Sequence, residues 1–156
     1  MNAHEIVSVD PVAHAAIWRY LLDIDLTGEV TYYNMAERRI GDALWLRLVD
    51  VDRALAQRRY SAPADLVLEL SDTFCPWNAG RWRFTVDGEG VAQVRRTDDD
   101  ADLAMGVADL GAVFLGGTAP AALAGAGRIS ELRPGALAAL ALTYSTERRP
   151  HCAELF

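Results

Sequence analysis

The chain has 156 residues, of which 51% are hydrophobic and 24% are charged, a composition typical of a folded globular domain. Its formal net charge of −7 argues against nucleic acid as a partner, because nucleic-acid binding requires clustered cations. All 15 basic residues are arginine, which excludes any chemistry that depends on a lysine, such as a Schiff base.

No run of apolar residues is long enough to cross a membrane, and residues 1–10 lack the pattern of a signal peptide. The two cysteines, Cys75 and Cys152, lie far apart in the sequence and predict no disulfide framework. We therefore expect a cytoplasmic protein with no membrane span.

The first part of the chain predicts two helices and two strands. Asp10 and Pro11 are typical of a helix start, and the apolar residues that follow recur at helical spacing. Asp50 predicts the start of a second helix, directly after a run of alternating apolar and polar residues that predicts a half-buried strand. The predicted elements are a helix over 12–23, strands over 30–33 and 44–49, and a helix over 50–60.

The second part predicts a hairpin, a further pair of strands and three helices. Residues 87–90 read Asp-Gly-Glu-Gly, which is typical of a hairpin turn. Gly116 and Gly117 separate two short helices and predict a helix end or a tight turn. Their alternative role is to let the backbone approach a ligand closely. The predicted elements are strands over 66–70, 81–86, 91–97 and 102–107, and helices over 109–114, 119–124 and 134–144.

This order of elements predicts an α+β fold. Strands joined by hairpins give an antiparallel sheet, and the helices that follow are expected to cover one face of it. The region 41–156 is self-contained in this pattern. Residues 1–40, with one helix and one strand, have the pattern of a short appendage.

Metal and nucleophile sites are not expected. His4, His14 and His151 are scattered and have no second ligand at metal spacing. The acidic run 98–102 lacks the glycine and glutamate of a calcium loop, so it predicts a solvated connection between strands rather than a cation site. Cys75 has no local base, and Cys152 directly follows His151, but adjacent residues do not normally form a catalytic Cys–His pair.

One pattern resembles a coenzyme-binding loop. Residues 38–43 fit R-x-x-G-x-A, the sequence by which GCN5-related acetyltransferases hold the pyrophosphate of coenzyme A. That loop needs backbone N–H groups at the start of a helix, but a strand pattern follows here. Asp42 would also place a carboxylate beside the phosphates. We therefore interpret the match as a coincidence.

The segment 74–84 interleaves two tryptophans and two arginines around Pro76 and Gly80. One interpretation is the start of a strand, with aromatic packing and guanidinium stacking. The other is a rigid aromatic wall of a ligand cavity, formed by Trp77, Trp82 and Phe84. The two interpretations do not exclude each other.

The end of the sequence combines an acidic and an apolar residue. Glu154 is followed after one residue by Phe156, which carries the α-carboxylate. If its ring is buried, a terminal phenylalanine can fix that carboxylate, which could then act as a base or bind an amine.

Several ordered motifs resemble the C-terminal domain of Eis-type GCN5-related N-acetyltransferases, a domain with a sterol-carrier-protein-2-like fold. The resemblance covers about 41–156. Upstream, residues 13–26 resemble the end of the central acetyltransferase-like domain of that family, so 1–40 are interpreted as its remnant. The motifs are Leu44-Trp45-Leu46-Arg47-Leu48-Val49-Asp50-Val51, Cys75-Pro76-Trp77-Asn78-Ala79-Gly80-Arg81-Trp82, Leu110-Gly111-Ala112-Val113-Phe114-Leu115-Gly116-Gly117, Ala126-Gly127-Arg128-Ile129 and Pro134-Gly135-Ala136-Leu137.

The resemblance implies a supporting role in acetyl transfer. In that family acetyl-CoA binds to an N-terminal domain with no counterpart in this chain, so no cofactor is expected here. The C-terminal domain helps to wall the pocket for the amine substrate, and its terminal carboxylate is the general base. That base corresponds to Phe156, with Glu154 beside it.

We therefore expect a domain that contributes substrate pocket, carboxylate and oligomer contacts, and that is inactive alone. A second hypothesis is a free-standing carrier of a lipid or another apolar small molecule. A third is a partner subunit that docks onto a separately encoded acetyltransferase domain.

Overall fold

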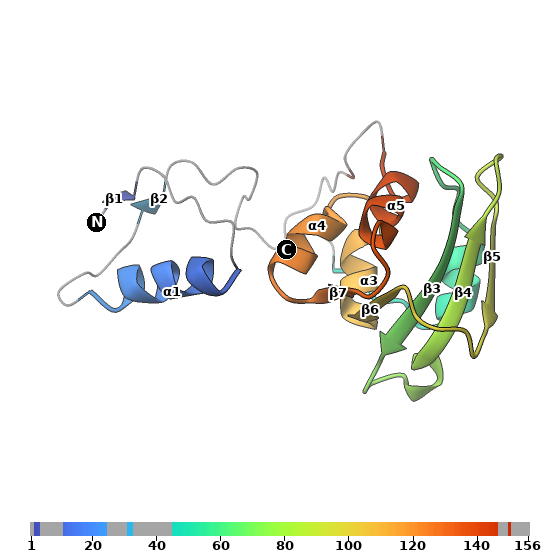
Figure 1. The fold of residues 1–156 in the computed structure, drawn as a ribbon, viewed down its shortest axis with the longest axis horizontal. Helices are drawn as coiled ribbons and strands as arrows, with labels where there is room; N and C mark the ends of the chain where they lie inside the picture. Colours follow the sequence, from blue (N-terminus) through green and yellow to red (C-terminus); the bar gives the residue numbers. More distant parts are fainter. Residues whose placement is uncertain (1, 4–10, 25–30, 33–44, 147–149, 151–156) are drawn as a thin grey trace. The chain divides into compact units, whose positions relative to one another are not determined.

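A computed structural model describes residues 2–3, 11–24, 31–32, 45–146 and 150 (Figure 1). The chain divides into two compact units, Met1–Asp42 and Ala43–Phe156. The described elements of the first unit are α1 (Pro11–Leu22) and two short parallel strands, β1 (Asn2–Ala3) and β2 (Thr31–Tyr32). The helix predicted over 12–23 and the short strand predicted over 30–33 are thus confirmed.

The second unit is built on a five-stranded sheet with the order β5-β4-β3-β6-β7. Its neighbouring strands are antiparallel except for β3 and β6, which are parallel. After the hairpin of β4 and β5, the chain returns to the free edge of β3 and pairs there as β6. The α+β class is confirmed, and the sheet is mixed rather than wholly antiparallel. The strands are β3 (Ala64–Ser71), β4 (Gly80–Val86), β5 (Ala92–Arg96), β6 (Leu103–Gly106) and β7 (Ile129–Glu131).

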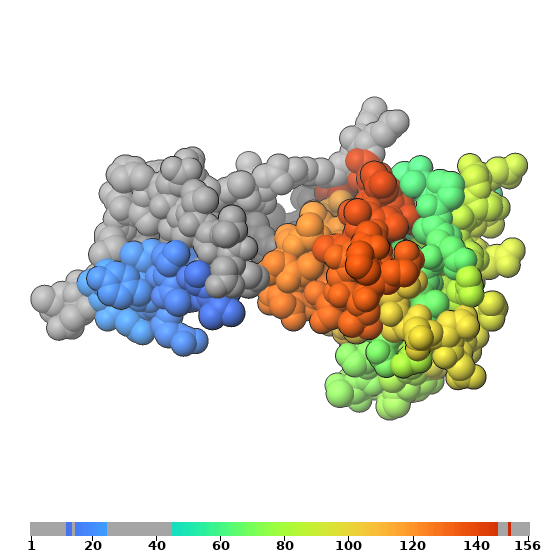
Figure 2. All heavy atoms as spheres, viewed as in Figure 1, coloured from blue at the N-terminus to red at the C-terminus, as the bar shows by residue number. Residues whose placement is uncertain are grey.

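Helices cover one face of this sheet, as predicted. In Figure 1, α3, α4 and α5 lie together on one side of the strands, and in the space-filling view the atoms of α5 adjoin those of β3 (Figure 2). The helical elements of this unit are α2 (Val51–Ala56), a 3₁₀ turn (Pro76–Asn78), α3 (Val107–Phe114), α4 (Pro120–Gly125) and α5 (Ala136–Thr143).

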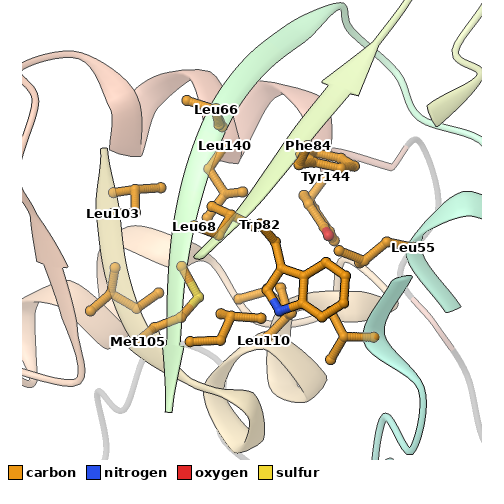
Figure 3. Close-up of a cluster of buried hydrophobic side chains, with 14 of the residues drawn as sticks. Leu55, Leu66, Leu68, Trp82, Phe84, Leu103, Met105, Leu110, Leu140 and Tyr144 are labelled. Atoms are coloured by element: carbon orange, nitrogen blue, oxygen red, sulfur yellow. The ribbon is translucent and has the colours of Figure 1, made fainter. Parts of the chain in front are cut away.

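The core lies between these helices and the sheet. Alternate residues of β3 and β4 point to the helical side, because side chains of a strand alternate between its faces. The register of the antiparallel strands β3 and β4 places Leu68 opposite Trp82 and Leu66 opposite Phe84. The core side chains drawn in Figure 3 include Leu55, Leu66, Leu68, Trp82, Phe84, Leu103, Met105, Leu110, Leu140 and Tyr144.

The other face of the sheet carries paired charges. Arg83 forms ion pairs with Asp65 and Asp99, the latter at 3.1 Å. Asp102, at the end of the acidic run, pairs with Arg133. The solvated connection predicted over 98–102 is thus a set of partners for arginines, and no group of residues able to hold a metal ion occurs in the described ranges.

Three elements differ from the sequence predictions: the helix predicted over 50–60 ends at Ala56, the strand predicted over 44–49 is not formed by its described residues, and β7 was not predicted. Residues 45–48 form no strand, although Leu48 is buried while Trp45 is exposed. This segment instead runs against α3, where a Cβ on Gly111 would lie 2.8 Å from the backbone oxygen of Leu46. The three-residue β7 was missed, since Ile129 is its only buried residue and supplies no alternating pattern. Among the described helices, none is long and apolar enough to cross a membrane.

Candidate functional site

Two residues of the predicted aromatic wall belong to the core. Trp82 and Phe84 are 7% and 0% exposed. The indole nitrogen of Trp82 donates a hydrogen bond to the backbone oxygen of Asn78 at 2.8 Å, and the guanidinium of Arg96 stacks 3.9 Å from its ring. The ring of Phe84 packs edge-on against Tyr60 at 5.0 Å. Packing and guanidinium stacking therefore account for this strand, as the first interpretation of the segment predicted.

Trp77 does not join them. Its side chain is 56% exposed, and it belongs to the 3₁₀ turn that precedes β4. The three aromatic residues thus do not form one wall. The predicted site residues Glu154 and Phe156 lie outside the described residues, as do His4, His151 and the pattern at 38–43. The side chain of His14 is likewise not described.

Trp77 is one of four exposed large apolar residues on the segments 45–49 and 74–77, which hydrogen bonds join and which we together call the aromatic surface. Its members are Trp45, Val49, Phe74 and Trp77, which are 85%, 57%, 78% and 56% exposed. Large apolar side chains that gather on a surface commonly mark a contact site. Sequence reasoning overlooked Trp45 and Phe74, although the alternation over 44–49 already placed Trp45 and Val49 on one side.

A buried carboxylate holds the loop of the aromatic surface in place. Asp72 accepts hydrogen bonds from the backbone N–H groups of Phe74 and Cys75, at 3.0 and 2.9 Å, and from the side chains of Asn78 and Arg47. Burial raises the pKa of Asp72, but these hydrogen bonds outweigh it and hold the pKa at about 2. The carboxylate is therefore ionised and fixes the loop at neutral pH.

Asn78 connects this loop to the segment that carries Trp45 and Val49. It is 1% exposed, and its amide oxygen accepts from the N–H of Val51 while its nitrogen donates to the oxygen of Val49. The indole nitrogen of Trp77 donates to the same Val49 oxygen at 2.9 Å. The guanidinium of Arg47 lies 5.1 Å from the ring of Phe74. The exposed side chains thus stand on a backbone held by buried polar groups.

A shallow depression of about 470 Å³ lies at the carboxyl ends of the parallel strands β3 and β6. Arg128 lines it, but its guanidinium pairs with the carboxylate of Asp109 at 2.6 Å. The cation is therefore neutralised within the chain. The lining residues are Glu69, Leu70, Ser71, Gly80, Ala104, Met105, Gly106 and Arg128.

The helix end predicted at Gly116 is confirmed. Gly116 follows α3 with a φ of +80°, and its N–H donates to the oxygen of Val113 at 2.8 Å. The segment after α5 passes close to this turn. A Cβ on Gly116 would lie 2.8 Å from Thr146, and one on Gly117 would lie 2.7 Å from Pro150. The close approach allowed by these glycines is that of the chain's own C-terminal segment.

Residues 51–153 match the sterol carrier protein domain family. The chain belongs to this family. It is also 46% identical to an uncharacterised N-acetyltransferase of Streptomyces avermitilis over 94% of this chain but 39% of the relative. N-acetyltransferase Eis of Mycobacterium tuberculosis is 29% identical over 80% of this chain and 34% of its own length.

Solved structures of N-acetyltransferases also resemble this chain. Eis1 from Mycobacterium abscessus superposes with a TM-score of 0.63 and 34% identity, over 99% of this chain and 43% of Eis1. A GCN5-related N-acetyltransferase from Kribbella flavida gives 0.63 and 28%, over 70% and 28% of the two chains. The resemblance to the C-terminal portion of Eis-type N-acetyltransferases is thus confirmed, and this chain spans about 40% of the curated relatives it matches.

Proposed function

We propose that this sterol-carrier-type domain serves an Eis-type N-acetyltransferase and catalyses no acetyl transfer by itself. The observation that carries the proposal is the match to the Streptomyces avermitilis N-acetyltransferase, which covers nearly all of this chain and 39% of the relative. In this proposal the remaining part of such an enzyme binds acetyl-CoA, and this chain binds no cofactor.

The aromatic surface supports a contact role for this domain. Aromatic side chains are favoured at the centres of protein contacts, because they bury a large area and have few rotatable bonds to restrict. Trp77 and Phe74 meet that description, and the network around Asp72 fixes their backbone before any contact forms. We propose that this surface packs against the acetyltransferase part and there helps to wall the amine-substrate pocket.

The carboxylate of Phe156 is the proposed general base, with Glu154 beside it to attract the cationic amine. This assignment rests on the family resemblance. Trp82 and Phe84 enter the proposal only indirectly, since they hold the sheet beneath the site and cannot touch a substrate from the core. We also propose that this domain contributes contacts between copies of the enzyme in an oligomer.

The alternative of a free-standing lipid carrier loses one of its two motives. It was suggested by Trp77, Trp82 and Phe84 as one wall of a cavity, but the last two are packed among leucines and tyrosines of the core. The match to the sterol carrier protein domain family remains as support for a carrier.

A chimera tests the proposal. This chain would replace the matching portion of the Streptomyces avermitilis relative, and acetylation of an aminoglycoside by acetyl-CoA would be followed through release of the thiol. We expect turnover by the chimera and none by this chain alone. The intact relative is the control for the assay. Measurable acetylation by the isolated chain, or an inactive chimera that folds and binds acetyl-CoA, would contradict the proposal.

A further inference from the structure

Two helices of the second unit contain no charged residue. α4 and α5 consist of alanine, leucine, glycine, proline and one threonine. The hydroxyl of that threonine, Thr143, is buried and donates to the backbone oxygen of Ala139 at 2.8 Å. Each of the other described α-helices carries at least one charged residue. A helix at a protein surface normally has a polar side, whereas a helix that is apolar all round is buried. α4 and α5 therefore lack the side that a helix facing water normally has.

Both helices nevertheless expose part of their surface. On α5, Ala136 and Leu140 are fully buried, whereas Ala138 and Leu142 are exposed, the latter by 64%. The two helices contact each other, and their orange and red-orange atoms adjoin in the space-filling view (Figure 2). We call their exposed residues together the α4–α5 face. Its members are Ala121, Ala122, Gly125, Ala138 and Leu142.

The charged residues between the two helices have partners within the chain. Arg128 pairs with Asp109 at 2.6 Å, and Arg133 pairs with Asp102. The carboxylate of Glu131 accepts a hydrogen bond at 3.0 Å from a backbone N–H in the first turn of α5. These groups form a polar rim that needs no charge from outside. The α4–α5 face therefore suits an apolar partner rather than a charged one.

The net charge of the chain favours this face for contact with a second copy. Two copies that each carry a charge of −7 repel each other, and a two-fold contact places like residues close together at its axis. A face without charge avoids that local repulsion, unlike the outer face of the sheet with Asp65, Arg83 and Asp99. Alanine and glycine also project little, so two such helices can pack at about 8 Å, the short end of the usual range.

We propose that the α4–α5 face binds the same face of a second copy of this chain, with the two α5 helices side by side about a two-fold axis. Leu142 lies at the centre of this contact, because it is the largest exposed side chain of the face and such contacts are most apolar at their centre. The inference rests on the proposed function, to which it adds the surface that joins the copies. The aromatic surface lies on other segments and is left to the acetyltransferase part.

The test measures the mass of the full chain by sedimentation equilibrium. The original chain should associate to twice its 17.0 kDa as its concentration rises. Leu142→Glu should raise the dissociation constant of the dimer by at least about tenfold, because both copies bring the new carboxylate to the same axis. A chain that stays monomeric at millimolar concentration, or a dimer that Leu142→Glu leaves intact, would overturn the proposal.

Leu22→Glu is the matched control. Leu22 ends α1, is also 64% exposed, and undergoes the same chemical change. This variant should associate like the original chain, so equal loss of the dimer in both variants would contradict a contact made by the α4–α5 face. Circular dichroism should show both variants folded, since each substitution is at an exposed position.

A mixture of two variants tests whether Leu142 meets its own copy. Leu142→Glu and Leu142→Arg should each be monomeric alone, because like charges meet at the axis, and should associate when mixed, because opposite charges then meet there. This readout does not depend on the original chain, and association in the mixture also shows that both variants are folded. Two variants that remain monomeric in the mixture would place Leu142 outside the contact.

The chimera separates this inference from the proposed function. Leu142→Glu should reduce the number of copies in the assembled chimera, and Leu22→Glu should not. An active chimera whose assembly is unchanged by Leu142→Glu would overturn the α4–α5 contact and leave the role in acetyl transfer intact. An inactive chimera that folds, binds acetyl-CoA and loses its assembly in Leu142→Glu would contradict the proposed function and support the contact.

Discussion

Four aromatic side chains within eleven residues of sequence end in two different environments. Trp82 and Phe84 are buried in the core, whereas Phe74 and Trp77 are exposed by 78% and 56%. The first pair lies on a strand whose alternation points it towards the helices. The second pair lies on a loop held by hydrogen bonds to Asp72. One half of the segment stabilises the fold, and the other half is free to make contacts.

The lesson is that aromatic content alone does not define a binding wall. Burial is decided by the backbone that carries each residue, here a strand on one side of Gly80 and a turn on the other. Substitutions in the two halves should therefore separate stability from function, and their expected effects on stability decrease in the order given below.

Phe84→Ala should have the largest effect on stability. The ring is fully buried against Tyr60 and Tyr144, and removal of such a ring leaves a cavity that costs about 4 kcal/mol. Urea unfolding followed by circular dichroism will measure the loss. A loss below about 1 kcal/mol would show that Phe84 does not pack as described.

Asp72→Ala should cost about 3 kcal/mol, because it breaks a buried network and leaves its hydrogen-bond donors without a partner. Equivalent unfolding experiments with the exposed Asp98→Ala should show little change.

The same carboxylate predicts a pH dependence. The pKa of Asp72 is lowered from 3.8 to about 2 in the folded chain, so its stabilisation is complete above about pH 5 and is lost as the pH falls towards 2. Asp72→Asn should remove that part of the stability profile. Identical slopes between about pH 5 and pH 2 in both proteins would mean that the pKa is not lowered.

Trp77→Ala should cost about 1 kcal/mol, since it removes one hydrogen bond to Val49 and little buried area. Its effect on the chimera should be larger, because a contact anchor is worth roughly a tenfold change in kcat/KM. If its effects on stability and on kcat/KM are equally small, Trp77 has no role in contact or in substrate binding.

Trp45→Ala should be the mildest for stability, with a change within about 0.5 kcal/mol, because its side chain is 85% exposed. Turnover by the chimera should still fall, since Trp45 shares the aromatic surface. Gln57→Ala, at an exposed position just after α2, is a control that should affect neither property.

The sequence predicted best where a local pattern decides the structure. The hairpin formed because Asp87 accepts from the N–H groups of Glu89 and Val91 and because Gly90 adopts a φ of +77°. The sequence predicted least well where a residue far along the chain decides the structure. Alternation over 44–49 specifies a buried side, but it cannot tell whether a strand or the helix that contains Gly111 will cover it.

The candidate site was predictable in part for the same reason. Trp77 was singled out from the segment 74–84, in which tryptophans and arginines interleave, but its separation from Trp82 depends on the turn that Asp72 and Asn78 close. The close approach at Gly117 could not be predicted from its sequence neighbours, because Pro150 meets it from 33 positions further along the chain.

The most direct test follows the tryptophans themselves. Both this chain and the chimera would be labelled with fluorotryptophan, the signals of Trp45, Trp77 and Trp82 assigned through Trp→Phe variants, and the solvent exposure of each fluorine measured. The account predicts that Trp45 and Trp77 are exposed in this chain and shielded in the chimera, while Trp82 is shielded in both. An active chimera in which Trp77 remains as exposed as in the isolated chain would contradict it.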